Sequence, residues 1–552
     1  MAADDAAARS VRVAPPDAPS APAAPRRPAR DRWIWPAALA VAAVVLFFCY
    51  WRIAGTVPVN ADGSDQVLQA WDMWHGNWLL SHWIVGDVSY YTTEIPEYIA
   101  IELVRNGFGP EVIHVGAAIT YALLVLAAGL AARGAALGRE GLVRLLIGSG
   151  IMLVPQLPHA GHLLVSQPDH IGTQLPLLIV FIVLDRAPRR WYTPVAIALL
   201  LTWIVISDRV AVFDAALPLT AACGLRALEG IFRTRKIRDQ WFELSLAVAG
   251  LAGFGLAELA VHAIKVLGGY SSLPLPSKLM HLRDLPHHLS VTAKGILSLY
   301  GADFSWGMSA GGIAMAVIHL VGVVLALAGF FLAVRRFFRT DELILPVMVT
   351  AIVFNLAAYF FSTVPATWFD TREIVAVLPF GAVLAGRQLA GPLRRARLEP
   401  WLAGVLVCYV AMLGYDVAQP ATPDTEHAIV PWLEAHHLST GIGTYTEDNL
   451  ISVDSGGKVN VYTVTWRTSG AVARAYESEL TWYDPRLHYA NFVVQNSADR
   501  VAVSLVPMRD IIALAGPPAH TYHYRTFTVM VWNQNLLADL GHPPSAFPGD
   551  VP

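Results

Sequence analysis

The fold class is decided by residues 308–334, which read Met-Ser-Ala-Gly-Gly-Ile-Ala-Met-Ala-Val-Ile-His-Leu-Val-Gly-Val-Val-Leu-Ala-Leu-Ala-Gly-Phe-Phe-Leu-Ala-Val. No Asp, Glu, Lys or Arg interrupts this run. A helix needs about 20 mostly apolar residues to cross a bilayer, so the run is long enough to span one. The sequence predicts a polytopic α-helical membrane protein with about eleven such helices. The other predicted spans are approximately 33–52, 111–132, 142–158, 171–186, 190–207, 210–226, 241–266, 342–362, 373–390 and 401–416.

Composition supports the same class. Of the 552 residues, 55% are hydrophobic and only 15% are charged, whereas soluble proteins carry about 25% charged residues. Most cytosolic enzymes are thereby excluded, and the lipid bilayer is the first expected partner. The net charge of −3 gives no reason to expect nucleic acid. Three widely spaced cysteines in apolar runs (Cys49, Cys223 and Cys408) indicate neither a disulfide framework nor a zinc site.

Charge in the loops predicts the orientation, because loops rich in Lys and Arg stay cytoplasmic. Arginine and lysine collect before residue 33 and in every second loop, which predicts a cytoplasmic N-terminus and a multi-pass protein of the plasma membrane. The opposite, outer side receives the loops at 53–110, 159–170, 208, 267–307 and 363–372, and everything after Tyr415. The cytoplasmic loops are those at 133–144, 186–190, 233–238, 335–339 and 394–397.

Three parts follow along the chain. Residues 1–32 are rich in Ala and Pro and predict a disordered cytoplasmic tail. Residues 33–415 form the transmembrane domain, including the first outer loop. Residues 416–552 alternate in short strand-like runs with helical patches, which predicts a small extracytoplasmic α/β domain. The strands are expected at 458–464, 491–494, 501–505 and 526–532, and the helical patches near 424–438 and 506–514.

The first outer loop contains the stretch from Asn60 to Gly76, which is typical of a loop opening into a helix. Its Trp71, Trp74 and Trp78 recur at helical spacing, an aromatic stripe suited to the lipid headgroup region. Asp62 and Asp65 lie at the helix start, with two interpretations. Either Asp62 is the N-cap and Asp65 is a first-turn carboxylate favoured by the helix dipole, or the two carboxylates have a function.

The residues that follow resemble a known family. Asn77-Trp-Leu-Leu-Ser-His-Trp83 and then Tyr90-Tyr-Thr-Thr-Glu-Ile-Pro-Glu-Tyr98 resemble the first outer loop of GT-C type glycosyltransferases, notably the protein mannosyltransferase and lipid A aminoarabinose transferase group. In that group an acidic pair opens a helix, a Gly-Asp-Trp-x-x-Pro-His-like turn follows, and a Tyr-Phe-x-Lys-Pro-Pro-like stretch comes next. The resemblance implies a GT-C-like fold and makes three residues candidates for substrate binding, namely His82, Glu94 and Glu97.

Two positions depart from the family pattern. Asp62 lies near the second acidic position and Ala61 at the first, so Asp65, one turn further on, is the candidate for the missing carboxylate. The family lysine is replaced by Glu94 or Ile95.

A second resemblance lies downstream. Thr371-Arg-Glu-Ile374 followed by Leu378-Pro379 resembles the Arg-Tyr-x-x-x-x-Pro sequence that opens a late span in the family, where the basic residue holds a lipid phosphate. The alternative for Arg372 is an arginine that extends to the membrane interface.

The resemblance implies an inverting transfer of a sugar from a polyprenyl phosphate to a cell-envelope acceptor at the outer face. Asp62 or Asp65 is then the general base for the acceptor hydroxyl, and Arg372 stabilises the departing phosphate. The orientation rule places both on the same side, as this chemistry requires. The alternatives are a transporter or flippase of lipid-linked or polar cargo, and a catalytically inactive member of the same fold. A nucleotide-driven pump is not indicated, since no Walker A sequence is present.

Further polar residues lie in the other outer loops. His159, His162, Asp169 and His170 either bind a divalent metal or line a polar cavity. Arg209 either forms an ion pair at a turn or contacts substrate, and the nearby Asp214 is either functional or its ion-pair partner. Lys278 belongs to a basic cluster that is either solvated or recognises a phosphate or acceptor; its other members are His281, Arg283, His287, His288 and Lys294.

Overall fold

The structure is a computed structural model that describes most of the chain. The described residues are 31–156, 160–166, 169–273, 277–305, 309–422, 426–445, 448–467, 470–474, 476–497 and 508–540. The predicted tail before residue 31, His159 and the predicted strand at 501–505 lie outside them.

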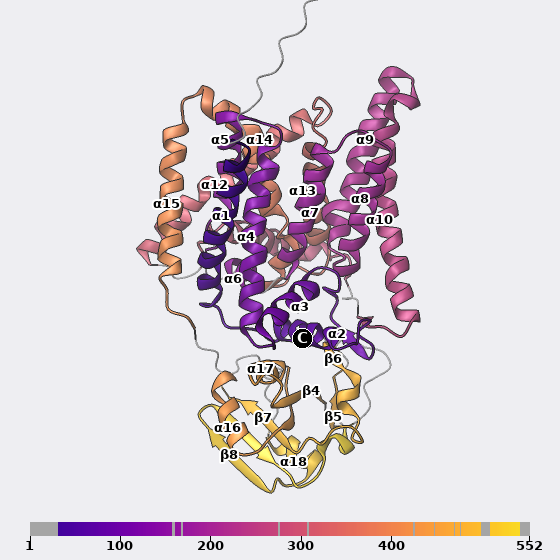
Figure 1. Cartoon of the computed structure of the whole chain (residues 1–552), viewed down its shortest axis with the longest axis vertical. Helices are drawn as coiled ribbons and strands as arrows, with labels where there is room; N and C mark the ends of the chain where they lie inside the picture. The colour runs from indigo at the N-terminus through magenta and orange to yellow at the C-terminus, as the bar shows by residue number, and fades with distance from the viewer. Residues whose placement is uncertain are drawn as a thin grey trace, which may run out of the picture.

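Long helices stand side by side in one bundle (Figure 1). Within the described residues, eight helical segments are long and apolar enough to cross a membrane. This confirms the predicted polytopic helical class. These segments are α1 (Asp31–Ala54), α4 (Glu111–Arg133), η1 with α9 (Val212–Ala216, Leu217–Thr234), η2 with α10 (Ile237–Gln240, Trp241–Val266), α12 (Ala310–Arg336), α13 (Ile344–Phe361), η4 with α14 (Phe369–Ile374, Val377–Arg395) and α15 (Glu399–Val417).

The remaining predicted spans coincide with shorter helices. α5 (Gly138–Ile151) has 14 residues, α7 (His170–Arg186) has 17 and α8 (Tyr192–Ser207) has 16. A straight crossing needs about 20 residues, so the count of about eleven spans stays a prediction. α7 and α8 nevertheless pack within the bundle beside the long helices α4 and α10.

Short helices cover one end of the bundle (Figure 1). α2 (Ala61–Trp74) and α3 (Glu94–Arg105) lie across that end, and α2 packs on α3. Val67 and Met73 of α2 and Tyr98 of α3 share a buried core that also includes Leu450 of the C-terminal region. The segment 53–110, which the sequence predicts to be the first outer loop, is therefore a packed layer rather than a free loop. We call it the outer layer. The other short helices of the transmembrane part are α6 (Ala160–Val165), η3 (Leu282–Asp284) and α11 (Leu285–Leu299).

Beyond this layer lies a six-stranded mixed sheet in the order β5-β4-β3-β7-β9-β8. β3 pairs in parallel with β4 and β7, and the other pairs are antiparallel. Side chains alternate between its faces: Phe492 and Val494 belong to one buried core, and Val493 to the other. The strands are β3 (Thr440–Gly443), β4 (Asn460–Arg467), β5 (Gly470–Ala473), β7 (Phe492–Asn496), β8 (His520–Tyr524) and β9 (Phe527–Val531).

Two helices of this region, α16 (Val430–Ala435) and α18 (Met508–Ala515), fall where the sequence predicts helical patches. A third helix, α17 (Asp448–Asp454), follows β3 and lies outside both predicted patches. α17 contacts both β4 and α2, so it bridges the sheet and the outer layer. The short 3-10 helices here are η5 (Glu426–Ala428), η6 (Leu480–Tyr483) and η7 (Leu536–Asp539).

A second, three-stranded sheet joins segments from three distant parts of the chain. β1 (Trp83–Val85) of the first outer loop pairs in parallel with β2 (Ser271–Ser272) and antiparallel with β6 (Ser478–Glu479). Trp83 faces Glu479 across the β1–β6 pair. The C-terminal region is thus hydrogen-bonded directly to the first outer loop.

The other end of the bundle holds a buried ion cluster. The side chain of Arg387 is only 2% exposed, and its Nη1 lies 3.0 Å from Asp185 and 2.8 Å from Glu342. Its Nε donates to the carbonyl oxygen of Ala131 at 2.7 Å. The cluster ties α14 to α7, to α4 and to the residues before α13.

Candidate active site

Arg372 is the centre of a polar cluster at the end of the bundle that α2 and α3 cover. It lies on η4, just before α14. Its Nη1 is 3.9 Å from Asp62 and 3.6 Å from Asp169, and its Nε is 3.8 Å from Glu373. These distances exceed the roughly 2.7–2.9 Å of a charge-assisted hydrogen bond, so the carboxylates neutralise the guanidinium without saturating its donors.

The structure places Asp62 in the first turn of α2, and it is not the N-cap. The cap is Asn60, whose side chain accepts a hydrogen bond from the backbone nitrogen of Gly63 at 3.0 Å. The capping interpretation of Asp62 is therefore wrong. With the helix end already satisfied by Asn60, the Asp62 carboxylate turns to Arg372 and remains 30% exposed.

Asp65 has a different environment from Asp62. It lies beyond the first turn, is 2% exposed and accepts a hydrogen bond from Gln69. Burial raises the pKa of its carboxyl well above the usual value, and the charge of Asp62 raises it further. Asp65 is thus a buried neighbour of Asp62 whose protonated form is favoured, and the expectation of a first-turn carboxylate held by the helix dipole is wrong for it.

The C-terminal region supplies two residues that touch Asp62. The hydroxyl of Tyr445 is hydrogen-bonded to Asp62 and to Glu477, and the Arg474 guanidinium lies 3.7 Å from the Tyr445 ring centre. One hydroxyl has one proton, so it can donate to only one of the two carboxyl groups. Burial raises the pKa of Glu477 well above its usual value, and the Asp62 charge raises it further. The protonated form of Glu477 is thereby favoured, which leaves the Tyr445 proton for the Asp62 carboxylate.

Asp169 and His170 occupy the start of α7 beside this cluster. Asp169 caps the helix, accepts from the Tyr90 hydroxyl at 3.0 Å and is 1% exposed. Burial opposes its charge, but the Arg372 guanidinium, His170 and the hydrogen bonds from the His170 backbone and the Tyr90 hydroxyl together lower the pKa of Asp169. His170 lies between two carboxylates, with Nδ1 2.9 Å from Asp208 and Nε2 3.2 Å from Glu373.

A cavity of about 380 Å³ adjoins the cluster. We call it the site cavity. Asp214, on the π-helical turn η1, supports its wall, accepting from Gln174 at 2.8 Å and from Asn355 at 2.7 Å. Asn355 also donates to the backbone oxygen of Glu373 at 2.8 Å, so this buried network positions the segment that carries Arg372. The lining includes Asp87, His170, Asp208, Arg209, Phe213, Asn355, Tyr359 and Glu373.

Backbone strain also occurs at this site. Tyr90 has φ of +51° and Glu477 has φ of +49°, a region that residues other than glycine rarely adopt. Such conformations cost on the order of 1–3 kcal/mol and persist where the surrounding contacts hold them, often at functional sites.

The other predicted residues lie outside the cluster. Arg209 lines the site cavity but pairs with Glu258 at 3.2 Å, so its pairing with Asp214 is wrong. Lys278 is exposed on the surface, and its backbone pairs with Thr363. His82 is exposed and its backbone oxygen accepts from Leu480.

Glu94 and Glu97 face a different cavity, on the other side of Ser207 and Asp208.

Trp74 and Trp78 of the predicted aromatic stripe are 43% and 58% exposed. Trp71 instead packs on Phe108 with ring centres 4.9 Å apart.

The carboxylates do not form a metal site in this arrangement. Within the described ranges, no group of three His, Cys, Asp or Glu side chains is placed to hold a metal ion. Asp62, Asp169 and Glu373 converge on the Arg372 guanidinium instead.

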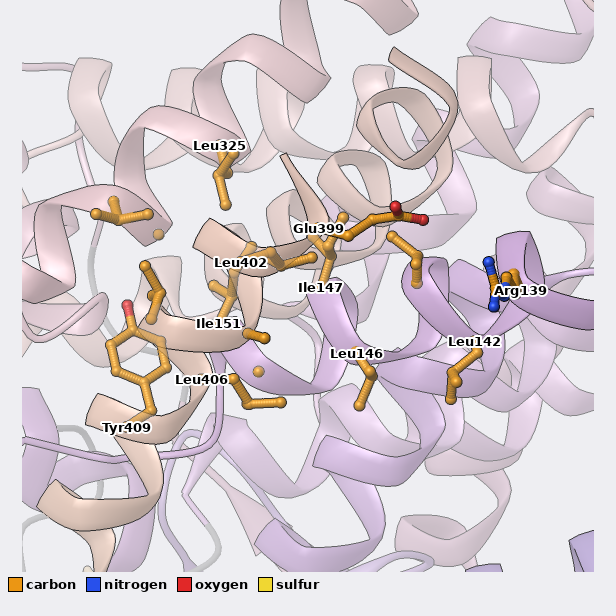
Figure 2. A pocket seen from close by; sticks show the side chains of 16 residues that line it. Arg139, Leu142, Leu146, Ile147, Ile151, Leu325, Glu399, Leu402, Leu406 and Tyr409 are labelled. Carbon is orange, nitrogen blue, oxygen red and sulfur yellow. The ribbon is translucent and has the colours of Figure 1, made fainter. Parts of the chain in front are cut away.

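A further cavity, of about 370 Å³, lies between α5, α12 and α15 (Figure 2). Leu146, Ile151, Leu325 and Leu402 are among its apolar lining, and Arg139 and Glu399 also line it. None of the residues around Arg372 lines it. We call it the apolar cavity, and its chemistry suits hydrocarbon rather than catalysis.

Comparison with known proteins identifies the architecture. No protein-family model matches the chain, and no curated protein matches it. Among solved structures, ArnT from Cupriavidus metallidurans bound to undecaprenyl phosphate superimposes with a TM-score of 0.51 at 12% identity, over 92% of this chain and 99% of that chain. The chain has a GT-C fold.

The oligosaccharyltransferase of Archaeoglobus fulgidus, also a GT-C protein, matches more loosely. One structure of it, tethered to an acceptor peptide containing the NVT sequon, covers 84% of this chain and 70% of that chain with a TM-score of 0.45 at 12% identity. Another, in complex with Zn and sulfate, covers 90% and 73% with a TM-score of 0.48, also at 12% identity. The likeness to ArnT confirms the GT-C fold that the first outer loop predicts.

The sequence does not identify several members of the cluster around Arg372. In the sequence, Glu373 is noticeable only as the neighbour of Arg372, and Asp208 only as part of a turn. Nothing in the sequence marks Tyr445 or Glu477, because their role depends on the C-terminal region folding back onto α2. Asp214 was the best available signal, since a carboxylate inside an apolar run is costly unless it is satisfied.

Proposed function

We propose that the protein is an integral membrane glycosyltransferase that moves a sugar from a polyprenyl phosphate to a cell-envelope acceptor at the outer face. The observation that carries this proposal is the meeting of Asp62 and Arg372, 310 positions apart in sequence, within 3.9 Å. One side chain can remove a proton and the other can stabilise a phosphate. The GT-C fold, shared with a transferase bound to undecaprenyl phosphate, supports the same class.

The chemistry assigns a role to each group. Asp62 accepts the proton of the acceptor hydroxyl as that oxygen attacks the anomeric carbon. The bond from this carbon to the phosphate oxygen breaks, and Arg372 stabilises the negative charge that the phosphate gains. A single direct displacement inverts the anomeric centre. Tyr445 keeps the Asp62 carboxylate oriented, and His170 and Asp169 hold the Arg372 segment.

The location follows from the same proposal. Polyprenyl-linked sugars reach the outer surface of the membrane, so the site, the outer layer and the sheet are extracytoplasmic and the N-terminus is cytoplasmic. The Arg387 cluster and the arginine-rich loops then face the cytoplasm, as the orientation rule requires. The boundaries 33–415 and 416–552 are part of this proposal.

The first test is binding of farnesyl phosphate to the full-length protein in nanodiscs. Replacing Arg372 with Gln removes the cation nearest to Asp62 and is expected to weaken binding about 10- to 100-fold, because a hydrogen bond to a charged group contributes about 1.5–3 kcal/mol. Titration calorimetry measures the affinity.

The matched control for this test is Arg283→Gln, since the Arg283 side chain is 82% exposed on the outer loop at 267–307. Binding should be unchanged in that variant. Equal affinity in the Arg372 and Arg283 variants would contradict the phosphate role. Repeating the titration with EDTA and with added Mg²⁺ or Mn²⁺ tests whether a metal contributes.

The link between Tyr445 and Glu477 gives a second prediction. Because burial and the Asp62 charge favour the protonated form of Glu477, Glu477→Gln keeps the hydrogen-bonding pattern and is expected to leave transfer nearly unchanged. Tyr445→Phe removes the donor to Asp62 and is expected to lower the turnover number about tenfold, the lower end of what a charged hydrogen bond contributes.

Steady-state transfer with a synthetic lipid-linked sugar measures both Tyr445→Phe and Glu477→Gln, and the Michaelis constant for the donor should stay constant. A larger loss in Glu477→Gln than in Tyr445→Phe would show that Glu477 acts as a charged carboxylate.

A further inference from the structure

A second cavity with a polar end lies near the site cavity, and the proposed transfer reaction does not use the residues that line it. It has a volume of about 200 Å³ and lies where α3, α4, α7 and α8 meet. We call it the acidic groove. Its polar end is formed by Glu94, Glu97 and Thr120, and its walls by apolar residues that include Ile179, Leu200 and Trp203.

The polar end of the groove has unmet hydrogen-bonding capacity. Glu94 is 1% exposed, and its Oε1 has no hydrogen-bond donor within the described part of the chain. The same holds for Oε1 of Glu97, whose other oxygen accepts from Thr120 at 2.9 Å. Burial raises the pKa of Glu94 well above its usual value and that of Glu97 to about 7. Buried oxygens without donors are costly, so a ligand that brings donors is stabilised here.

The charge of the lining sets the class of ligand. No Lys, Arg or His is among the described residues that line the groove. A phosphate would therefore meet carboxyl oxygens and no cation, whereas Arg372 lies on the other side of Asp208. A hydroxyl or an ammonium group offers the donors that Glu94 and Glu97 lack.

The groove also opens toward the hydrocarbon of the bilayer. Ile179 of α7 and Trp203 of α8 line it and are each 47% exposed. Both lie on helices of the bundle, where exposed apolar side chains face lipid. A ligand with a polar head at Glu94 and an apolar chain along Leu200 would fit both ends.

The groove and the active site share a wall. Thr93 is hydrogen-bonded to Glu94 and to the hydroxyl of Ser207, and the next residue, Asp208, binds His170 at 2.9 Å and lines the site cavity. A head group in the groove is thus one residue layer from the reacting centre.

We propose that the acidic groove binds a lipid whose head group donates hydrogen bonds and carries no negative charge, such as a long-chain alcohol or amine. This inference goes beyond the proposed transferase function, because Asp62 and Arg372 do not line the groove. Glu94 and Glu97 hold the head group, and the walls between α7 and α8 hold the chain.

The test uses three probes with one chain and different heads: farnesol, farnesylamine and farnesyl phosphate. Each is titrated into the full-length protein in phosphatidylcholine nanodiscs, and binding is followed by calorimetry. Farnesol and farnesylamine are expected to bind without competing with farnesyl phosphate. The double variant Glu94→Gln with Glu97→Gln removes both carboxyl groups and should weaken farnesylamine about tenfold or more, farnesol less, and farnesyl phosphate not at all.

A filling variant tests the walls. Leu200→Trp is expected to reduce binding of both farnesol and farnesylamine about tenfold or more. Its matched control is Leu146→Trp, the same change in the apolar cavity of Figure 2, which should leave all three affinities unchanged. Thermal unfolding of each variant establishes that it is folded.

Two outcomes overturn the proposal. One is that farnesylamine binds equally to the wild type and to the Glu94, Glu97 and Leu200 variants, or does not bind at all. The other is that farnesyl phosphate displaces it and Arg372→Gln abolishes both. Because binding is measured without transfer, a protein that binds the amine in the groove but transfers no sugar would contradict only the proposed function.

Discussion

Replacing Asp62 with Asn is expected to lower the rate of sugar transfer about 10³-fold. A positioned general base contributes about 10²- to 10⁴-fold, and Asn keeps the shape of the side chain while losing the ability to take a proton. Hydrogen bonds from Tyr445 and the approach to Arg372 can still form, so the protein should insert and fold normally. Transfer is measured with a lipid-linked sugar in nanodiscs, alongside farnesyl phosphate binding, which should change little.

Asp65→Asn is the matched control for this experiment. Asp65 is on the same helix, but it is buried, and burial favours the protonated form of its carboxyl. The uncharged amide of Asn has a similar shape to that form. The rate should stay within about tenfold of the wild type, a change of about 1.4 kcal/mol in the barrier. The reverse order, with Asp65 more sensitive than Asp62, would make Asp65 the base. If both variants transfer normally, neither carboxylate is the base, whereas a wild type that transfers no sugar would be a non-catalytic member of the fold.

The second large effect is expected at the opposite end of the bundle, where Arg387→Leu should lower the free energy of unfolding by about 3–5 kcal/mol. Removing one partner of a buried ion pair leaves the other charge without compensation. Here Asp185 would remain, with its side chain only 9% exposed. The midpoint of thermal unfolding in nanodiscs measures the loss.

Arg394 provides the control for the Arg387 prediction, since it lies on the same helix α14. Its side chain is 34% exposed, and it pairs with Glu399 at 3.3 Å and Glu140 at 3.9 Å. Exposed pairs contribute about 0–1 kcal/mol, so Arg394→Leu should change stability little. If both variants lose a similar free energy of unfolding, the buried Arg387 cluster contributes no more to stability than the exposed Arg394 pairs do.

The sequence was sufficient to predict the helical membrane class, because hydrophobic length is a local property that each span carries by itself. Residues 308–334 predict α12 without reference to any other part of the chain. Short helices such as α5 and α7 are harder, since they rely on neighbours rather than on their own length. The strands at 458–464 and 526–532 were predictable because short runs with alternating apolar residues are typical of β-strands.

The candidate site was only partly predictable. Asp62 and Arg372 could be found, because each stands beside a motif that a known family shares. Their partners come from β-strand pairing and loop placement, which leave no periodic signal: Tyr445 follows β3, and Glu477 directly precedes β6. The capping role of Asn60 was missed because two acceptors, at positions 60 and 62, compete for the same helix end.

The three-stranded sheet β2-β1-β6 has a consequence for biosynthesis. Asp62 leaves the ribosome early, but the strand that follows Glu477 is made only after every membrane helix has been synthesised. The Asp62 carboxylate therefore gains its Tyr445 partner only when the last quarter of the chain has been made and has paired with β1. A nascent or truncated chain would sit in the membrane with the surroundings of Asp62 incomplete, so under the proposed function only a finished chain would transfer sugar.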